Sequence, residues 1–162
     1  MFSLLSCYII FHPVRMIMTG WKNLKLKEYL LVPLFGGIGY STLEVLWRGY
    51  THWTMALTGG AGLLVLYIVA GLTQWGFWKK CFNGCLCLTC LELMVGTIVN
   101  LYMNWHVWDY SDQPGNFFGQ ICPLYTVFWF FLCLFLVPIC SWIRLFLYPP
   151  QKPLPACPDK IT

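Results

Sequence analysis

Charged side chains are scarce in this chain of 162 residues. Asp, Glu, Lys and Arg make up only 10% of it, whereas 59% of the residues are hydrophobic and the mean hydropathy is +0.65. Soluble domains carry about 25% charged residues, and a chain this short cannot hide so much apolar surface inside a water-soluble fold. The scarcity of charge therefore excludes an ordinary soluble domain and indicates an integral membrane protein.

Two functional signatures are also missing from the sequence. The formal net charge is +4, but no run of basic residues is dense enough for a nucleic-acid-binding surface. No GxxxxGK[ST] sequence occurs, so the chain cannot hydrolyse ATP through a phosphate-binding loop of that kind. We therefore expect no nucleic-acid partner, and any ATPase would be a separate chain.

The nine cysteines do not form a metal-binding pattern. Cys87-Leu88-Thr89-Cys90 is formally a CxxC sequence, but no second pair and no histidines follow at the spacing that a zinc site requires. Cysteine is often a small buried hydrophobe, and those at positions 81–90 lie within one apolar stretch. We interpret them as packing residues of a membrane helix and expect neither a metal nor another cofactor.

Four apolar stretches are long enough to cross a bilayer, which takes roughly 20 residues. They lie at residues 29–47, 53–73, 81–102 and 121–143. Backbone groups in lipid must be hydrogen-bonded within their own segment, so an all-α bundle of about four transmembrane helices is predicted at residues 29–147. Residues 1–28 are predicted to be an N-terminal interfacial or cytoplasmic segment, with Met16 and Met18 as alternative starts. The proline-rich residues 148–162 are expected to be a disordered cytoplasmic tail.

The distribution of basic residues predicts the orientation of the bundle. With four spans, nine of the ten lysines and arginines fall on one side of the membrane and only Arg48 falls on the other. Basic residues concentrate in cytoplasmic segments. Both termini are therefore predicted to be cytoplasmic.

The first apolar stretch contains a carboxylate. Gly37, Ser41, Glu44 and Arg48 recur at helical spacing and so share one face. Glu44 and Arg48 lie four residues apart and can form a structural ion pair, yet a carboxylate inside the membrane is costly and often functional. Both interpretations of Glu44 stay open. The second stretch carries Gly59, Gly60 and Gly62, which we interpret as a helix-packing face.

The third stretch contains a deeper carboxylate, Glu92. It shares a helix face with Gly96 and Asn100, and the face continues into a polar loop at residues 104–119 that contains no Lys or Arg. A structural alternative for Glu92 is a protonated carboxyl bonded to a neighbouring helix. We expect no catalytic residue of the serine-histidine-aspartate type. We predict that six polar residues converge near the outer half of the bundle and bind substrate: Glu44, Glu92, Asn100, Asp109, Asn116 and Gln120.

Several motifs resemble one known family. They are Glu92 to Asn100, Trp108-Asp109-Tyr110-Ser111, Pro114 to Cys122 and Trp129, with a looser likeness over Gly39-Tyr40, Glu44 and Arg48-Gly49. This order and spacing resemble the bacterial putative ABC-transporter type IV family, which is CmpB-like and related to the TMEM229 membrane proteins. The resemblance implies a permease subunit in the bacterial plasma membrane.

Three functions follow as hypotheses. The first is a permease subunit that binds or moves a small solute or a lipid, and its four helices imply either a homo-oligomer or a separate ATPase subunit. The second is a membrane-embedded enzyme that acts on a lipid or isoprenoid, with Glu92 and Asp109 as acid and base. The third is a structural or regulatory membrane subunit whose polar residues only hold helices together.

Overall fold

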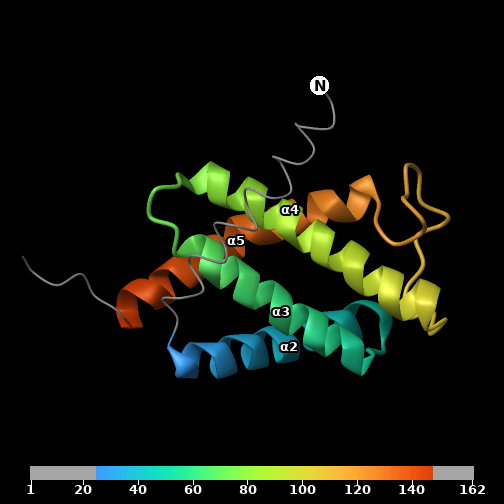
Figure 1. Ribbon diagram of the computed structural model, residues 1–162, viewed down its shortest axis with the longest axis horizontal. Coiled ribbons are helices and arrows are strands. Elements are labelled where there is room, and N and C mark those ends of the chain that lie inside the picture. The colour runs from blue at the N-terminus through green and yellow to red at the C-terminus, as the bar shows by residue number, and fades with distance from the viewer. Residues whose placement is uncertain (1–24, 148–162) are drawn as a thin grey trace, which may run out of the picture.

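The computed structural model describes residues 25–147, and these residues are almost entirely helical (Figure 1). The helices are α2 (Leu26–Arg48), α3 (Trp53–Ala70), α4 (Phe77–Gly96) and α5 (Pro123–Leu147), and a π-helical segment, η1 (Thr97–Tyr102), continues α4. Counting α4 with η1, four helices in this part of the chain are long and apolar enough to cross a membrane. The predicted all-α bundle of four spans is therefore confirmed. Most of the predicted N-terminal segment and the predicted tail lie outside the described residues.

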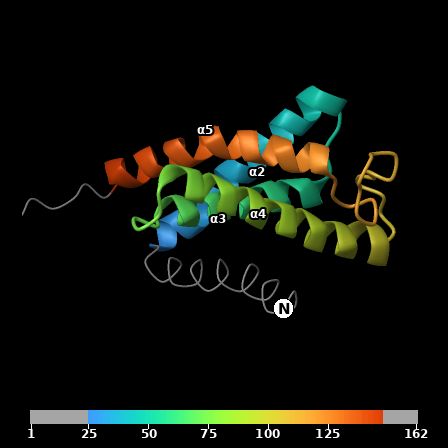
Figure 2. The same ribbon diagram turned by 90° about the horizontal axis from the view of Figure 1, so that it is seen from above.

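The four helices run antiparallel to one another in chain order, as Figure 1 shows. α3 contacts each of the other three, while α2 packs chiefly on α3 and α4 packs chiefly on α5. The loop at residues 103–122 and the short connection at residues 49–52 lie at one end of the bundle (Figures 1 and 2). The start of α2, the connection at residues 71–76 and the end of α5 lie at the opposite end.

Basic residues of the described chain gather at the end opposite the long loop. Arg48 alone is placed beside the loop, in the last turn of α2. The predicted orientation depends on this distribution of basic residues, and the orientation stays a prediction. The residues at the basic end are Lys25, Lys27, Lys79, Lys80 and Arg144.

Helix α2 has polar and small residues inside and apolar residues outside. Its buried residues are Glu28, Gly36, Gly37 and Glu44. Large apolar side chains cover its outer surface, among them Leu30, Phe35, Ile38 and Leu46. Lipid is the only solvent that favours this arrangement, because polar groups in a membrane helix turn toward the protein interior.

Glycines bring α2 and α3 into close contact. A Cβ atom on Gly60 would lie 2.7 Å from the carbonyl oxygen of Pro33, and one on Gly37 would lie 2.7 Å from the carbonyl oxygen of Ala56. Small residues permit this approach of two backbones. The predicted helix-packing role therefore holds for Gly59 and Gly60, which meet α2 at Tyr40 and Pro33, and for Gly62, which packs on Leu88 of α4.

Cysteines form part of the core at the middle and basic end of the bundle. Cys81 and Cys85 of α4 pack with Cys133 and Cys140 of α5 in one hydrophobic cluster. These cysteines act as small apolar residues, as predicted. Cys90 is exposed on the surface of α4, so the interpretation as a buried residue is wrong at that position, because Cys90 lies on a different face of the helix from Cys81 and Cys85.

Substitution of Gly60 tests the close approach of α2 and α3. Gly60→Val should lower the thermal stability in detergent micelles, because overpacking a tight contact costs about 1–3 kcal/mol. Gly39→Ala is the matched control, since a Cβ at Gly39 meets nothing within 4 Å. Unfolding followed by tryptophan fluorescence should show a lower midpoint for Gly60→Val alone. Equal midpoints for the two variants would contradict the glycine contact.

Candidate functional site

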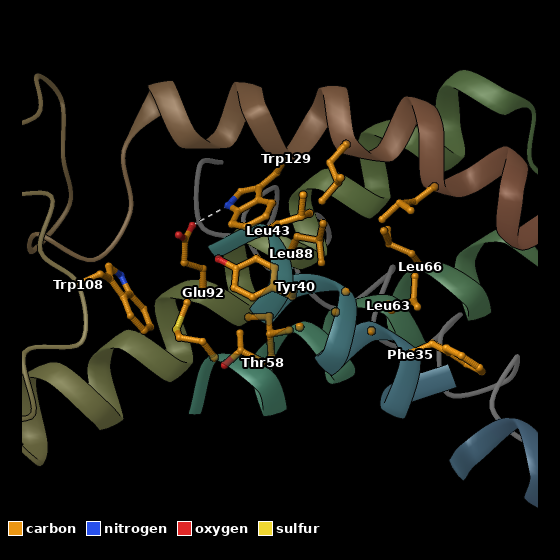
Figure 3. A pocket seen from close by; sticks show the side chains of 18 residues that line it. Phe35, Tyr40, Leu43, Thr58, Leu63, Leu66, Leu88, Glu92, Trp108 and Trp129 are labelled. Atoms are coloured by element: carbon orange, nitrogen blue, oxygen red, sulfur yellow. Dashed lines mark hydrogen bonds between the residues drawn. The ribbon is translucent and has the colours of Figure 1, made fainter. Parts of the chain in front are cut away.

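A partly open apolar cavity of about 330 Å³ lies between the helices of the bundle. All four helices and Trp108 of the long loop contribute to its wall. Figure 3 shows Phe35, Leu63 and Leu66 toward one end and Glu92 and Trp108 toward the other. Glu92 is the carboxylate of a wall that is otherwise largely aliphatic and aromatic: Phe35, Gly36, Gly39, Tyr40, Leu43, Met55, Thr58, Gly59, Gly62, Leu63, Leu66, Leu88, Leu91, Trp108, Trp129, Leu132 and Leu136.

A second cavity, of about 450 Å³, adjoins the first. The two share Tyr40, Leu43, Met55, Trp108, Trp129 and Leu132 as lining residues. We call the second one the aromatic cavity, because seven of its twelve lining residues are aromatic. These seven are Tyr40, Trp47, Trp108, Tyr110, Tyr125, Phe128 and Trp129. Glu44 and Arg48 also border it.

Glu92 is held by two neutral donors. Its side chain is only 6% exposed. The Tyr110 hydroxyl donates to Oε1 at 3.0 Å, and the Trp129 indole Nε1–H donates to Oε2 at 2.8 Å. Figure 3 shows the hydroxyl end of Tyr40 turned toward the same carboxylate. No described cation forms an ion pair with Glu92, so its carboxylate lies in an apolar wall without a countercharge.

Tyr110 brings the long loop onto the bundle. Its ring stacks on Tyr125 of α5, with ring centroids 4.3 Å apart. Burial raises the pKa of the Tyr110 hydroxyl well above its usual range, and the nearby Glu92 carboxylate adds to this effect. The hydroxyl therefore stays protonated and remains a donor to Glu92.

Glu44 and Arg48 form an ion pair at the loop end of α2. The Thr51 hydroxyl donates to the other oxygen of Glu44. Arg48 also donates from Nη1 to the carbonyl oxygen of Val107 at 3.3 Å, and its guanidinium lies 5.0 Å from the centre of the Tyr50 ring. The charge of Glu44 is thus compensated locally, whereas that of Glu92 is not. One donor of the guanidinium, Nε, is buried without a hydrogen-bond partner.

Asn100 and Gln120 fasten the two ends of the long loop together. Asn100, 5% exposed, donates from Nδ2 to the Trp108 carbonyl oxygen and to Gln120 Oε1, both at 2.9 Å. Its Oδ1 accepts from the Val107 backbone N–H at 2.8 Å. Gln120, 3% exposed, donates to the Phe118 carbonyl oxygen at 2.9 Å. The polar atoms of both amide side chains are therefore occupied by the loop itself.

Asp109 and Asn116 shape the outer part of the loop. Asp109 Oδ1 accepts from the Ser111 backbone N–H at 2.9 Å and from its hydroxyl at 2.6 Å. The bond from the Ser111 hydroxyl holds the pKa of the Asp109 carboxyl below its usual range. Asn116 donates to the carbonyl oxygens of Ser111 and Gln113 and accepts from the Gly119 N–H at 3.0 Å. Neither Asp109 nor Asn116 borders either cavity.

The structure divides the six residues predicted to bind substrate into three groups. Glu92 borders the apolar cavity and Glu44 borders the aromatic one. Asn100 and Gln120 lie together behind the cavity wall, and Asp109 and Asn116 lie in the loop. Sequence reasoning missed the aromatic residues that surround Glu92, although three of them stand in the motifs quoted above: Tyr40, Tyr110 and Trp129.

Comparison with family models identifies the family of the chain. A family model described as "Putative ABC-transporter type IV" matches residues 7–148. The match includes the four helices, the long loop and all residues that line the two cavities. No curated protein and no solved structure matches the chain.

Removal of the Asn100 amide tests how the loop is fastened. Asn100→Leu should leave the Val107 N–H and the Trp108 carbonyl unpaired, and each buried unpaired group costs about 1–3 kcal/mol. We expect faster hydrogen exchange and faster proteolysis across residues 103–119. Asn83→Leu is the matched control, since Asn83 lies in α4 far from the loop and donates to the Lys79 carbonyl oxygen. Equal loop protection in the two variants would contradict this role of Asn100.

The Tyr110–Glu92 bond predicts a pH dependence. Tyr110→Phe should lower the free energy of unfolding at neutral pH by about 0.5–1.5 kcal/mol. The pKa of Tyr110 is raised in the folded protein, so its stabilising effect is complete below the unfolded pKa of about 10 and is lost as pH rises above it. Chemical unfolding of both proteins at several pH values should show the difference shrinking above pH ~10. A difference that is independent of pH would contradict the bond.

Proposed function

Because the chain belongs to the Putative ABC-transporter type IV family, we propose that it is a membrane-embedded transporter subunit that binds a small apolar or amphipathic molecule. The observation that supports this proposal is the apolar cavity of about 330 Å³ that has a carboxylate at one end. Ligand sites are typically apolar cavities in which a few polar groups fix the orientation of the ligand. Glu92 is the group in position to do this.

The ligand would enter from the lipid between α2 and α5. These two helices are the least buried of the four spans, with 17% of each span buried against 50% for α3 and 39% for α4 with η1. Both helices line the apolar cavity, through Phe35 and Leu43 on α2 and through Leu132 and Leu136 on α5. A molecule already dissolved in the membrane would therefore reach the cavity without crossing water.

The polar end of the cavity would supply selectivity. Lipid tails are as apolar as leucine side chains, so an apolar wall alone gives a ligand little preference for the protein over the bilayer. Glu92, together with the hydroxyl of Tyr40, would distinguish ligands by their polar group. In this proposal Asn100 and Gln120 act by fastening the loop that carries Trp108 and Tyr110.

The transporter would need further subunits. The sequence has no phosphate-binding loop of the GxxxxGK[ST] type, so ATP hydrolysis would take place on a separate chain. Four helices are few for a complete translocation pathway, and a second copy of the chain or the partner subunit would complete it.

Filling the apolar cavity tests the proposed function. Gly39 lines the cavity, and a Cβ on it meets nothing within 4 Å. Gly39→Leu should therefore occupy the cavity and leave the fold unchanged. Native mass spectrometry of the full chain released from lipid nanodiscs should show a bound small molecule on the wild type that Gly39→Leu loses, while Gly39→Ala retains most of it.

Two results would contradict the proposed function. One is a wild-type protein that carries no bound molecule. The other is a bound molecule that survives equally in Gly39→Leu, because it would then occupy the lipid-facing surface and not the cavity. Thermal unfolding of both Gly39 variants serves as the folding control.

A further inference from the structure

The charge of the ligand can be inferred from the surroundings of Glu92. A carboxylate inside a membrane protein tends to acquire a partner of opposite charge or to bind a proton. The donors that reach Glu92 are the neutral groups of Tyr110 and Trp129. Both donors favour an ionised carboxylate, since each points a hydrogen at one of its two oxygens, while burial in the apolar wall opposes ionisation. The described residues thus leave Glu92 without a countercharge, and a cationic ligand would supply one.

The aromatic cavity beside Glu92 is suited to a cation. Seven of its twelve lining residues present aromatic rings, and a cation near the face of such a ring is attracted by the electron density of the ring. Tyr40 and Trp129 line both cavities, and their ring centroids lie 6.1 Å apart. A positive group placed near this pair would be close to aromatic rings and to the Glu92 carboxylate together.

The formal charges that border the two cavities sum to a negative value. Glu44 and Arg48 cancel as an ion pair, and Glu92 remains. Arg48 is the group that could favour an anion, because its Nε has no hydrogen-bond partner. Its Nη1 and Nη2 are already used by Val107 and Glu44, however, and its guanidinium lies over Tyr50.

We propose that the ligand is a hydrophobic organic cation, such as an amine or quaternary ammonium group attached to an apolar body. The positive group lies between the Glu92 carboxylate and the aromatic rings, and the apolar body fills the apolar cavity. This inference rests on the proposed function, because it assigns the ligand class of the same cavity.

A pair of ions with the same shape and opposite charge tests the ligand class. Tetraphenylphosphonium and tetraphenylborate each carry four phenyl rings. Isothermal titration of the full chain in dodecyl maltoside micelles, corrected with empty micelles, should show saturable binding of the phosphonium only. Binding of the borate with equal or higher affinity would overturn the proposal and would point to Arg48 as the charged group of the site.

Three variants locate the site of phosphonium binding. Glu92→Gln should weaken binding about tenfold or more, because it removes the charge that faces the cation. Trp47→Leu should weaken it about threefold, and Trp47 is 82% exposed at the cavity wall, so its loss should not unfold the protein. Asp109→Asn is the matched control: it removes a carboxylate that borders neither cavity, and it should bind like the wild type.

The failure of this inference is distinguishable from failure of the proposed function. If Gly39→Leu loses its bound molecule but the two tetraphenyl ions bind alike, the cavity holds a ligand and the preference for a cation is wrong. If neither ion binds and the Gly39 variants carry the same molecules as the wild type, both proposals are wrong. Unchanged phosphonium binding in both Glu92→Gln and Trp47→Leu would also overturn the inference.

Discussion

The structure around the cavities depends on how one carboxylate is accommodated inside a membrane bundle. Glu92 lies on α4, and its two oxygens accept hydrogen bonds from the long loop and from α5. A carboxylate that had no such donors would be very costly at this depth. The two bonds therefore tie three separate parts of the chain together. They also keep the carboxylate in the wall of the apolar cavity, where it can meet a ligand.

The loop at residues 103–122 is held by hydrogen bonds in a shape that brings Tyr110 to Glu92. Asn100 and Gln120 join the start and the end of the loop, and the indole of Trp108 donates to the Gln120 carbonyl oxygen at 3.1 Å. These bonds place Trp108 and Tyr110 against the cavities. Residues that do not touch the ligand site thus position those that form it. The polar loop and the small residues that bring α2 and α3 together have the same effect, because both hold the residues of the cavity wall in position.

Much of the fold was predictable from the sequence because the membrane imposes simple rules. Apolar length gave the four spans, and helical spacing correctly placed Glu44 with Gly37 and Glu92 with Gly96 on buried faces. The contact of Glu44 with Arg48, one turn along the same helix, could be expected from spacing alone, whereas the partners of Glu92 could not. Trp129 lies 37 residues from Glu92 and Tyr110 lies 18 away, so only the packing of helices brings them together. Aromatic residues near the ends of spans can also be interfacial anchors, and the sequence alone does not distinguish aromatic residues that line a cavity from aromatic residues that anchor a helix.

Carbon-13 NMR of the glutamate carboxyl groups tests the central claim, that Glu92 is the polar end of a ligand site, most directly. The chain contains three glutamates, Glu28, Glu44 and Glu92, and Glu28 lies at the opposite end of the bundle, where it accepts from the Tyr67 hydroxyl. The protein would be labelled selectively at glutamate and measured in lipid, and the Glu92 resonance would be identified by its absence in Glu92→Gln. This resonance should shift as tetraphenylphosphonium saturates the site, while the Glu28 resonance stays in place. A Glu92 resonance that does not move at saturation would contradict the account.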